Sequence, residues 1–308
     1  MNDGRRFLPV PDALIGERVD SAVARMLGLS RTKVADMCDA GLVRGDGEIL
    51  TRSAKLRPGM MLELQMPAPR VYQDFVVAGM RIIHDDADLV VVDKPAGVAA
   101  HFSNGWSGPT VVGSLRASGF GITGLGPPER EGIVHRLDVG TSGIMVVAKS
   151  DRAYSALKRA FKNREVTKKY LALAQGRVEP ATGLIDAPIA HYGGPGWKMA
   201  IRPTGKPAQT RYRVHTRYES ATLLDVELLT GRTHQIRVHA ASIGHPLVGD
   251  GIYGADAELT AAVGLERQWL HAHELTLLHP GTGREVTYRS DPADDLARAL
   301  ARLGPPLY

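Results

Sequence analysis

Apolar residues near the start of the chain recur at the spacing of a helix. Between Val19 and Leu27 they fall every three or four residues, and Gly28 follows as a C-terminal stop. Ser30 can cap a second helix with an apolar face, which Gly41 would end. We therefore predict two short helices in this part of the chain.

Short strand-like segments follow the helix pair. Leu42–Arg44 leads into a turn at Gly45–Gly47, and apolar and polar residues alternate along Met60–Met66. A helix pair followed by a hairpin predicts a compact α+β module, which we place at residues 1–68.

A linker and a larger domain come next. Pro67-Ala68-Pro69 and the polar residues after it indicate a linker, which we place at residues 69–79. From about Met80 the apolar strands become longer and alternate with helices, which predicts a second domain, residues 80–308, of mixed α/β or α+β type. Its expected strands are Leu89–Val92, Ile144–Ala148, Tyr170–Ala174, Thr222–Leu229, Glu274–Leu278 and Glu285–Tyr288. Its expected helices are Asp151–Phe161, His234–Ile243 and Ala293–Leu303.

Composition is consistent with two globular domains. The chain has 308 residues, of which 44% are apolar and 23% charged. No apolar run reaches the length of a membrane span, and the first residues lead into no signal segment, so we expect a cytoplasmic protein without a membrane partner. The single cysteine, Cys38, fits a reducing compartment and excludes an internal disulfide and a cysteine-based metal site.

The charge balance favours a polyanionic partner. The formal net charge is +5 at pH 7. Aromatic residues make up only 6% of the chain, so a broad base-stacking platform is not expected.

Asp138 is the first candidate for chemistry. It follows directly after His135-Arg136-Leu137, precedes the turn Gly140–Gly143 and stands at the entrance of the apolar strand Ile144–Ala148. A carboxylate there would lie at the floor of a cleft, where its neighbours can fix its charge and position. The alternative is a loop aspartate that hydrogen-bonds its own turn.

Three further clusters lie in the second domain. Lys94–Gly97 follows a strand, and its Pro-Ala-Gly sequence is typical of a structural turn. Lys168-Lys169-Tyr170 opens a strand behind further basic residues, which form either a phosphate-binding surface or a solvated helix end. Thr230–His239 brings two arginines and two histidines to the start of a helix.

Arg237 lies in the first turn of that helix. It could reach a buried carboxylate and hold it ionised, or form a surface salt bridge of little consequence. The histidines of this region are accompanied by no His-Glu-x-x-His sequence and no cysteine pair, so we expect hydrogen bonds or contacts with a polyanionic partner, and no metal.

Together these sequences resemble the RluA-type pseudouridine synthases. The shared strings are KPAG, HRLD with TSG, KKY, and GRTHQIRVH followed by GHPLVGD, and they lie behind a module that resembles the S4 RNA-binding domain. The resemblance covers nearly the whole chain and implies an α+β fold, with a mixed, mainly antiparallel sheet in the catalytic domain. One departure is Val139-Gly140, where many members carry a charged pair.

The resemblance also implies roles for single residues. Asp138 would be the catalytic aspartate, Tyr170 would pack against the uracil and assist proton removal from C5, and Arg237 would pair with Asp138, with Arg232 as a competitor for that contact. Arg136 would help to extract the base from the RNA. The expected RNA contacts are Arg136, His135, Arg232, Lys168, Lys169, Arg31 and Lys33. No cofactor is needed because the isomerisation involves no net redox change.

We expect a monomeric isomerase that converts uridine to pseudouridine in structured RNA. The expected substrate is large-subunit ribosomal RNA. Transfer RNA is the alternative substrate. A non-enzymatic RNA-binding or ribosome-assembly protein and a glycosidase-like hydrolase with a second carboxylate are the alternative classes. The isomerase hypothesis predicts that the Arg237 guanidinium lies within salt-bridge reach of Asp138, with the Tyr170 ring alongside.

Overall fold

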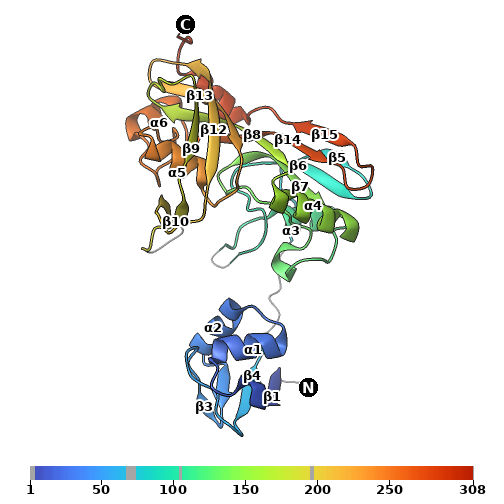
Figure 1. The fold of residues 1–308 in the computed structure, drawn as a ribbon. Helices are drawn as coiled ribbons and strands as arrows, with labels where there is room; N and C mark the ends of the chain where they lie inside the picture. Colours follow the sequence, from blue (N-terminus) through green and yellow to red (C-terminus); the bar gives the residue numbers. More distant parts are fainter. Residues whose placement is uncertain (1–3, 67–73, 104–105, 195–197, 308) are drawn as a thin grey trace. The chain divides into compact units, whose positions relative to one another are not determined.

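The computed structural model describes residues 4–66, 74–103, 106–194 and 198–307 (Figure 1). The chain divides into two compact units, Met1–Val71 and Tyr72–Tyr308. The linker sequence Pro67-Ala68-Pro69 lies outside the described residues. No helix in the described ranges is both long and apolar enough to cross a membrane.

The first unit is a small α+β domain. Its helices are α1 (Val19–Leu27) and α2 (Arg31–Asp39), and its four-stranded sheet has the order β1 (Arg5–Pro9), β4 (Met61–Gln65), β2 (Val43–Gly45) and β3 (Glu48–Ile49). Gly28 ends α1 in the left-handed conformation, and the Ser30 hydroxyl accepts a hydrogen bond from the Lys33 N–H. The predicted helix pair is therefore confirmed, whereas the strand β1 was not predicted.

The second unit is built on a mixed, mainly antiparallel sheet, as expected. The order of its main path is β5 (Arg81–Asp85), β6 (Leu89–Lys94), β7 (Ser142–Ala148), β14 (Leu270–Leu278), β8 (Thr167–Gln175), β13 (Ala221–Leu228), β12 (Gln209–Arg217) and β9 (Thr182–Asp186). Strand β15 (Glu285–Arg289) pairs with β14, and β10 (Ile189–His191) and β11 (Met199–Ile201) form a separate pair. Within the described residues, β7 and β14 are the parallel neighbours of this sheet.

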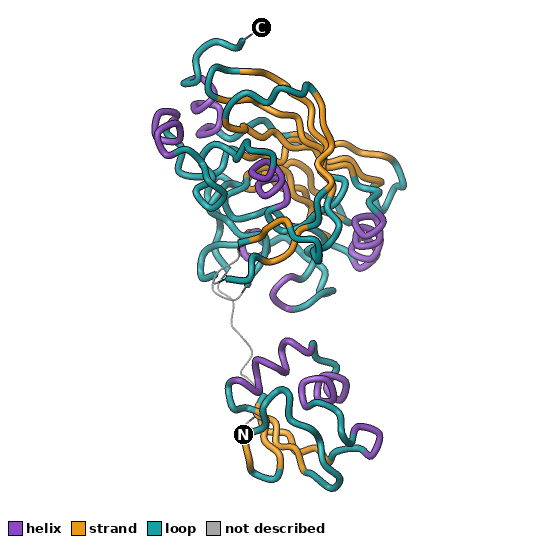
Figure 2. Tube along the Cα trace, turned by 60° about the vertical axis from the view of Figure 1, so that its left-hand side comes forward, coloured by secondary structure: helices purple, strands orange, loops and turns teal. Residues whose placement is uncertain are grey.

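The helices of this unit are α3 (Val111–Ala117), α4 (Asp151–Asn163), α5 (Gln235–Ser242), α6 (Ala257–Val263) and α7 (Asp294–Ala301). Among the described residues there are also two short 3-10 turns, Asp12–Leu14 in the first unit and Pro128–Arg130 in the second. In Figure 1, α3 and α4 lie by the β6–β7 half of the sheet, and α5 and α6 lie by the β12–β13 half. Figure 2 shows the strands gathered together, with the helices outside them.

The apolar run that forms β7 is buried on both faces. Met145 and Val147 belong to one core cluster, whereas Ile144 and Val146 belong to a second cluster that includes Leu157 of α4. A strand covered on both sides needs an unbroken apolar sequence, which explains why this run shows no alternation.

Candidate active site

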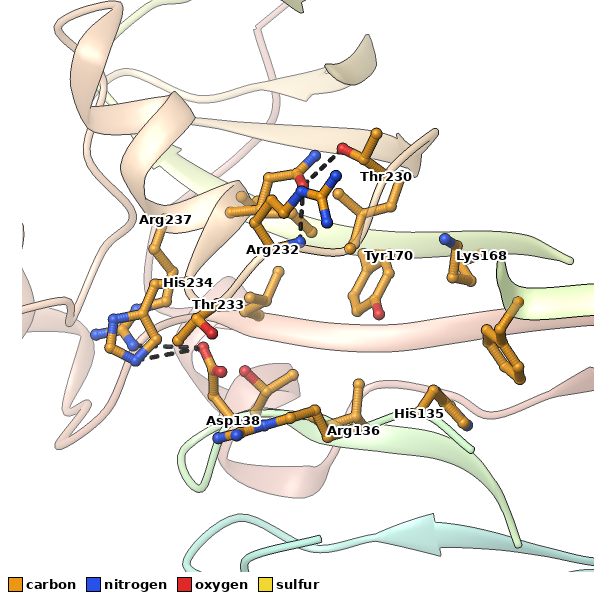
Figure 3. Close-up of a pocket in the computed structure, with 18 of the residues that line it drawn as sticks. His135, Arg136, Asp138, Lys168, Tyr170, Thr230, Arg232, Thr233, His234 and Arg237 are labelled. Carbon is orange, nitrogen blue, oxygen red and sulfur yellow. Dashed lines mark hydrogen bonds and ion pairs between the residues drawn. The ribbon is translucent and has the colours of Figure 1, made fainter. Parts of the chain in front are cut away.

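A pocket of about 440 Å³ opens in the second unit (Figure 3). Its lining comes from the loop before β7, the end of α4 with the start of β8, and the connection from β13 to α5. The volume lies in the range of small-molecule sites and is large enough for a nucleotide base with its sugar.

The sheet register places two of these segments next to each other. Gly143 of β7 pairs with Ala272 of β14, and Ala272 pairs with Tyr170 of β8, so the three residues form a row across the sheet. Gly143 has φ 117°, and a Cβ atom there would lie 2.2 Å from the Ala272 carbonyl oxygen. Only glycine therefore permits this strand contact, which sets the loop of Asp138 two strands from Tyr170.

Asp138 faces the pocket from that loop, and its side chain is 18% exposed. Its Oδ2 atom lies 3.4 Å from Nη1 of Arg237 and 3.9 Å from Nε2 of His234. Its own turn is closed by the backbone, because the Thr141 N–H donates to the Asp138 carbonyl oxygen. Among the described residues, the Asp138 carboxylate makes no hydrogen bond to that turn. The alternative of a loop aspartate that hydrogen-bonds its own turn is therefore not supported.

Buried polar groups hold the loop of Asp138 from below. The Lys94 side chain is completely buried, and its ammonium donates to the carbonyl oxygens of Pro95, Val98 and Val139. Burial lowers the pKa of Lys94, and the nearby Asp138 carboxylate opposes that effect. Three carbonyl acceptors match the three N–H groups of an ammonium, so the KPAG sequence anchors the residue next to Asp138.

The other side of the loop is fixed by two neighbouring residues. Arg267 donates from Nη1 to the Gly140 carbonyl oxygen at 2.9 Å and pairs with Asp295 of α7. Gln268 donates to the Thr141 hydroxyl, and a Cβ atom on Gly140 would lie 2.6 Å from the Gln268 amide oxygen. Gly140 is part of the departure from the family pattern. Because it has no side chain, it leaves room for the Gln268 side chain.

Arg237 makes its tightest contacts with the last residue of the shared string GHPLVGD, Asp250, to which no role was assigned. Its Nε and Nη2 atoms donate to the two oxygens of Asp250, at 2.6 and 2.7 Å. Although burial disfavours the charged guanidinium, Asp250 and then Asp138 raise the pKa of Arg237. The predicted contact between Arg237 and Asp138 is present, but Asp250 is the residue that fixes the guanidinium plane.

The connection from β13 to α5 is held by Gln235. Its Oε1 atom accepts from the Thr230 hydroxyl and from the Arg232 N–H, and its Nε2 atom donates to the Gln209 carbonyl and the Thr210 hydroxyl. All four hydrogen-bonding positions of the amide are used, so Gln235 fixes the loop that precedes Arg237.

Alternation along β8 separates its predicted functional residues. Lys168 and Tyr170 line the pocket, and burial lowers the pKa of Lys168 and raises the pKa of Tyr170. The Tyr170 side chain points into the pocket in Figure 3. Lys169 is not part of the lining and instead pairs with Glu274 at 2.7 Å. The structure thus does not bring Lys169 to this site, because adjacent residues of a strand point to opposite faces.

His135 and Arg136 differ in their surroundings. The His135 ring stacks on Phe161 with a centroid distance of 4.6 Å, and its Nε2 accepts from the Val146 N–H at 3.0 Å. Burial, and then the charge of Lys168, lower the pKa of His135 to about 3, so the imidazole is neutral. Arg136 is exposed at the pocket, where its guanidinium is accessible to a ligand.

The pocket is strongly cationic around a single acid. Arg232 lines it and donates from Nε to the Pro207 carbonyl oxygen, and the ion pair with Asp138 is made by Arg237. Asp138 is the only carboxylate among the described lining residues. The basic side chains of the lining are Arg136, Lys162, Arg164, Lys168, Arg232 and Arg237. This distribution suits a polyanion that presents one neutral group to the carboxylate.

A group of side chains with metal-binding spacing lies outside the pocket lining. It comprises His84, Asp86 and His279, and both imidazoles contact Asp86 Oδ2, at 3.0 and 2.7 Å. His279 Nδ1 accepts from the N–H groups of Gly281 and Thr282. Its Nε2 therefore carries the proton and donates to Asp86, which makes this group a hydrogen-bonded network.

The predicted residues Arg31 and Lys33 belong to the first unit and are exposed at the start of α2. Arg31 pairs with Asp20 at 3.1 Å, a carboxylate that Arg18 also holds. Hydrogen bonds, first of all from Arg18, lower the pKa of Asp20, so it remains charged and orients both guanidinium groups.

The mixed sheet and the basic pocket around Asp138 are consistent with an RNA-modifying enzyme, and comparisons with known proteins identify the class. The family model described as RNA pseudouridylate synthase matches residues 88–242. The chain therefore belongs to the RNA pseudouridylate synthase family, in its RluA-type branch, and it is an enzyme of that class.

Two relatives match nearly the full length of this chain. An uncharacterized RNA pseudouridine synthase of Mycobacterium bovis is 52% identical over 96% of this chain and 97% of the relative. Ribosomal large subunit pseudouridine synthase D of Nitrosomonas europaea is 38% identical over 97% of this chain and 88% of the relative. The solved structure of human RNA pseudouridylate synthase domain containing 1 is similar, with a TM-score of 0.57 and 28% identity. The match covers 73% of this chain and 86% of the human chain.

Proposed function

We propose that this enzyme isomerises uridine to pseudouridine in large-subunit ribosomal RNA, with Asp138 as its catalytic carboxylate. The observation that carries the proposal is the position of Asp138 as the only described carboxylate of a pocket lined by six basic side chains. A phosphate backbone can be held by those cations, while the uncharged uridine meets the carboxylate.

The reaction needs few groups from the protein. The bond from C1′ to N1 of uracil breaks, the base turns, and a bond from C1′ to C5 forms, while C5 loses a proton and N1 gains one. No atom is added or removed overall. Asp138 either stabilises the positive charge that develops at C1′ or forms a covalent adduct with that carbon.

Tyr170 is placed to hold the uracil. Its ring is buried in the wall of the pocket, and the hydroxyl has no hydrogen bond to another described residue. Because burial, and then the Asp138 charge, raise the pKa of Tyr170, the hydroxyl is protonated before substrate binds. We infer that the ring packs on the base and that the hydroxyl takes part in the proton transfer at C5.

The exposed arginine of the loop has a separate role. Arg136 stands two residues before Asp138 at the open side of the pocket. A target uridine must leave its stack to reach Asp138, and a guanidinium can stabilise the space that it leaves. We infer this role for Arg136, and phosphate contacts for Lys168 and Arg232.

The choice of ribosomal RNA has two supports. The Nitrosomonas europaea relative is named a ribosomal large subunit enzyme, and its similarity extends through both units of this chain. The first unit presents the exposed side chains of Arg31 and Lys33 at the start of α2, where they can meet a phosphate backbone.

Pseudouridine mapping by carbodiimide modification tests the proposal. RNA is compared from cells with the gene, without it, and with an Asp138→Asn gene restored. We expect one or more large-subunit sites to disappear on deletion and to stay absent with the Asn variant. Loss of transfer RNA sites alone would assign the other substrate, and an unchanged map would overturn the proposal.

A further inference from the structure

His234 adopts a backbone conformation that is uncommon for residues other than glycine. It precedes α5 with φ 56° and ψ 22°, in the left-handed region that usually favours glycine. Such a conformation persists where the surrounding structure enforces it, and it is common at functional sites. Here it turns the imidazole toward Asp138, with the side chain 13% exposed (Figure 3).

The Tyr253 hydroxyl is placed to set which nitrogen of His234 carries the proton. The Tyr253 hydroxyl lies 2.8 Å from His234 Nδ1 and accepts a hydrogen bond from the Met199 N–H at 2.9 Å. The Met199 N–H can only donate, and the Tyr253 O–H donates to no other described residue, so its proton is available to His234 Nδ1. An imidazole that accepts at Nδ1 carries its proton on Nε2 when it is neutral.

The protonated nitrogen then faces the catalytic carboxylate. His234 Nε2 lies 3.9 Å from Asp138 Oδ2, the same oxygen that Arg237 Nη1 approaches at 3.4 Å. The dashed contacts drawn to Asp138 in Figure 3 therefore meet at one oxygen. The other oxygen, Oδ1, makes no hydrogen bond to any residue that the structure describes.

Tyr253 also connects the two donors. The Arg237 guanidinium carbon lies 5.0 Å from the centre of the Tyr253 ring, and the His234 ring meets the Tyr253 ring edge-on at 5.6 Å. One tyrosine thus positions both groups that approach Asp138 Oδ2. Burial lowers the pKa of His234, which favours the neutral imidazole that this arrangement requires.

We propose that His234, held by Tyr253 with its proton on Nε2, is a positioning residue that fixes Asp138 through Oδ2 and leaves Oδ1 for the nucleotide. This inference rests on the proposed role of Asp138. The distance of 3.9 Å is longer than a hydrogen bond, and hydrogen bonds of catalytic groups are often long in the free enzyme and tighten in the substrate complex.

The tautomer can be measured without substrate. Two-bond ¹H–¹⁵N correlation spectra at pH 7.5 distinguish the two ring nitrogens, and the His234 signals are those that vanish in His234→Gln. We expect a protonated Nε2 and an unprotonated Nδ1, with a mixture of tautomers in Tyr253→Phe. An Nδ1-protonated ring or an imidazolium in the unsubstituted protein would overturn the proposal, whatever the activity of the enzyme.

Turnover separates positioning from backbone conformation. Glutamine can place an N–H near the position of Nε2, whereas asparagine adopts the left-handed conformation well but is too short to reach Asp138. We expect His234→Asn to lower kcat about 100-fold with little change in KM for RNA, and His234→Gln to lower it less than about 10-fold. The exposed His215→Gln on β12 is the matched control and should leave kcat unchanged.

An asparagine variant as active as the glutamine variant would overturn the proposal, because backbone conformation would then be the only requirement. Changes of equal size in KM and in kcat for His234→Asn would also overturn the proposal. If the unsubstituted enzyme modifies no RNA, the proposed function fails, and the tautomer measurement still decides the structural part separately.

Discussion

Arg237 donates two hydrogen bonds to Asp250, of 2.6 and 2.7 Å, and both side chains are almost completely buried. The Nη1 atom of the guanidinium lies 3.4 Å from Oδ2 of Asp138. Asp250 thus orients the cation, and the cation in turn holds the catalytic carboxylate. A buried charge that loses its partner destabilises the fold, so the Arg237–Asp250 pair also contributes to the stability of the protein.

Removal of Asp250 should therefore affect stability and activity together. We expect Asp250→Ala to lower the free energy of unfolding by about 3–5 kcal/mol, because the Arg237 charge is left buried with only the longer contact to Asp138. The exposed Arg213–Asp225 pair is the control, and Asp225→Ala should cost less than about 1 kcal/mol. Urea denaturation measures both, and equal losses would show that Asp250 has no special role.

Much of the fold follows from local patterns, whereas the site depends on contacts between distant residues. The helix pair and the unbroken run of β7 were predicted because their periodicity is strong. The edge strand β9 has few apolar residues and was not predicted. The strand β12 was missed although Tyr212 and Val214 alternate with exposed arginines along it. Exposed strands show how they pair only in the folded sheet.

The same distinction applies within the site. Asp138, Tyr170 and Arg237 stood out because each occurs in a distinctive sequence. Asp250 ends the shared string GHPLVGD, but no role was assigned to it from the sequence, and Tyr253 lies outside the shared strings. Their contacts with Arg237 and His234 appear only in the fold. Lys169 could have been assigned correctly, since the two-residue period of a strand places it opposite Lys168 and Tyr170.

Lys168 and Lys169 provide a matched pair for RNA binding. We expect Lys168→Ala to weaken RNA binding and to reduce the slope of log K against log salt by about 1, because one phosphate contact is lost. Lys169→Ala should leave the slope unchanged, since its side chain pairs with Glu274 outside the pocket. Filter binding across a salt series measures both variants, and identical slopes would contradict the placement of Lys168.

Tyr170→Phe tests the hydroxyl apart from the ring. Because the ring remains in the pocket wall, we expect RNA affinity to change less than about twofold, while turnover falls by about 100-fold, the usual size of a proton-transfer contribution. Single-turnover kinetics on a labelled RNA measure the chemical step directly. Wild-type turnover in this variant would restrict Tyr170 to a packing role.

The first unit should contribute binding and no chemistry. We expect Arg31→Ala combined with Lys33→Ala to weaken RNA binding and to lower its salt dependence, because two cations at the start of α2 are removed. The control removes two exposed arginines from elsewhere in the unit, Arg44→Ala with Arg57→Ala. If the two double variants bind RNA equally well, the role assigned to α2 is wrong.

The release of tritium from C5 of uridine tests the central claim most directly. Cellular RNA from a strain without the gene is labelled with [5-³H]uridine and incubated with the purified enzyme, and isomerisation frees one tritium for each pseudouridine formed. We expect release by the unsubstituted enzyme and none by Asp138→Asn, with both proteins equally folded and equally able to bind RNA. Tritium release by Asp138→Asn at the rate of the unsubstituted enzyme would contradict the catalytic role of Asp138.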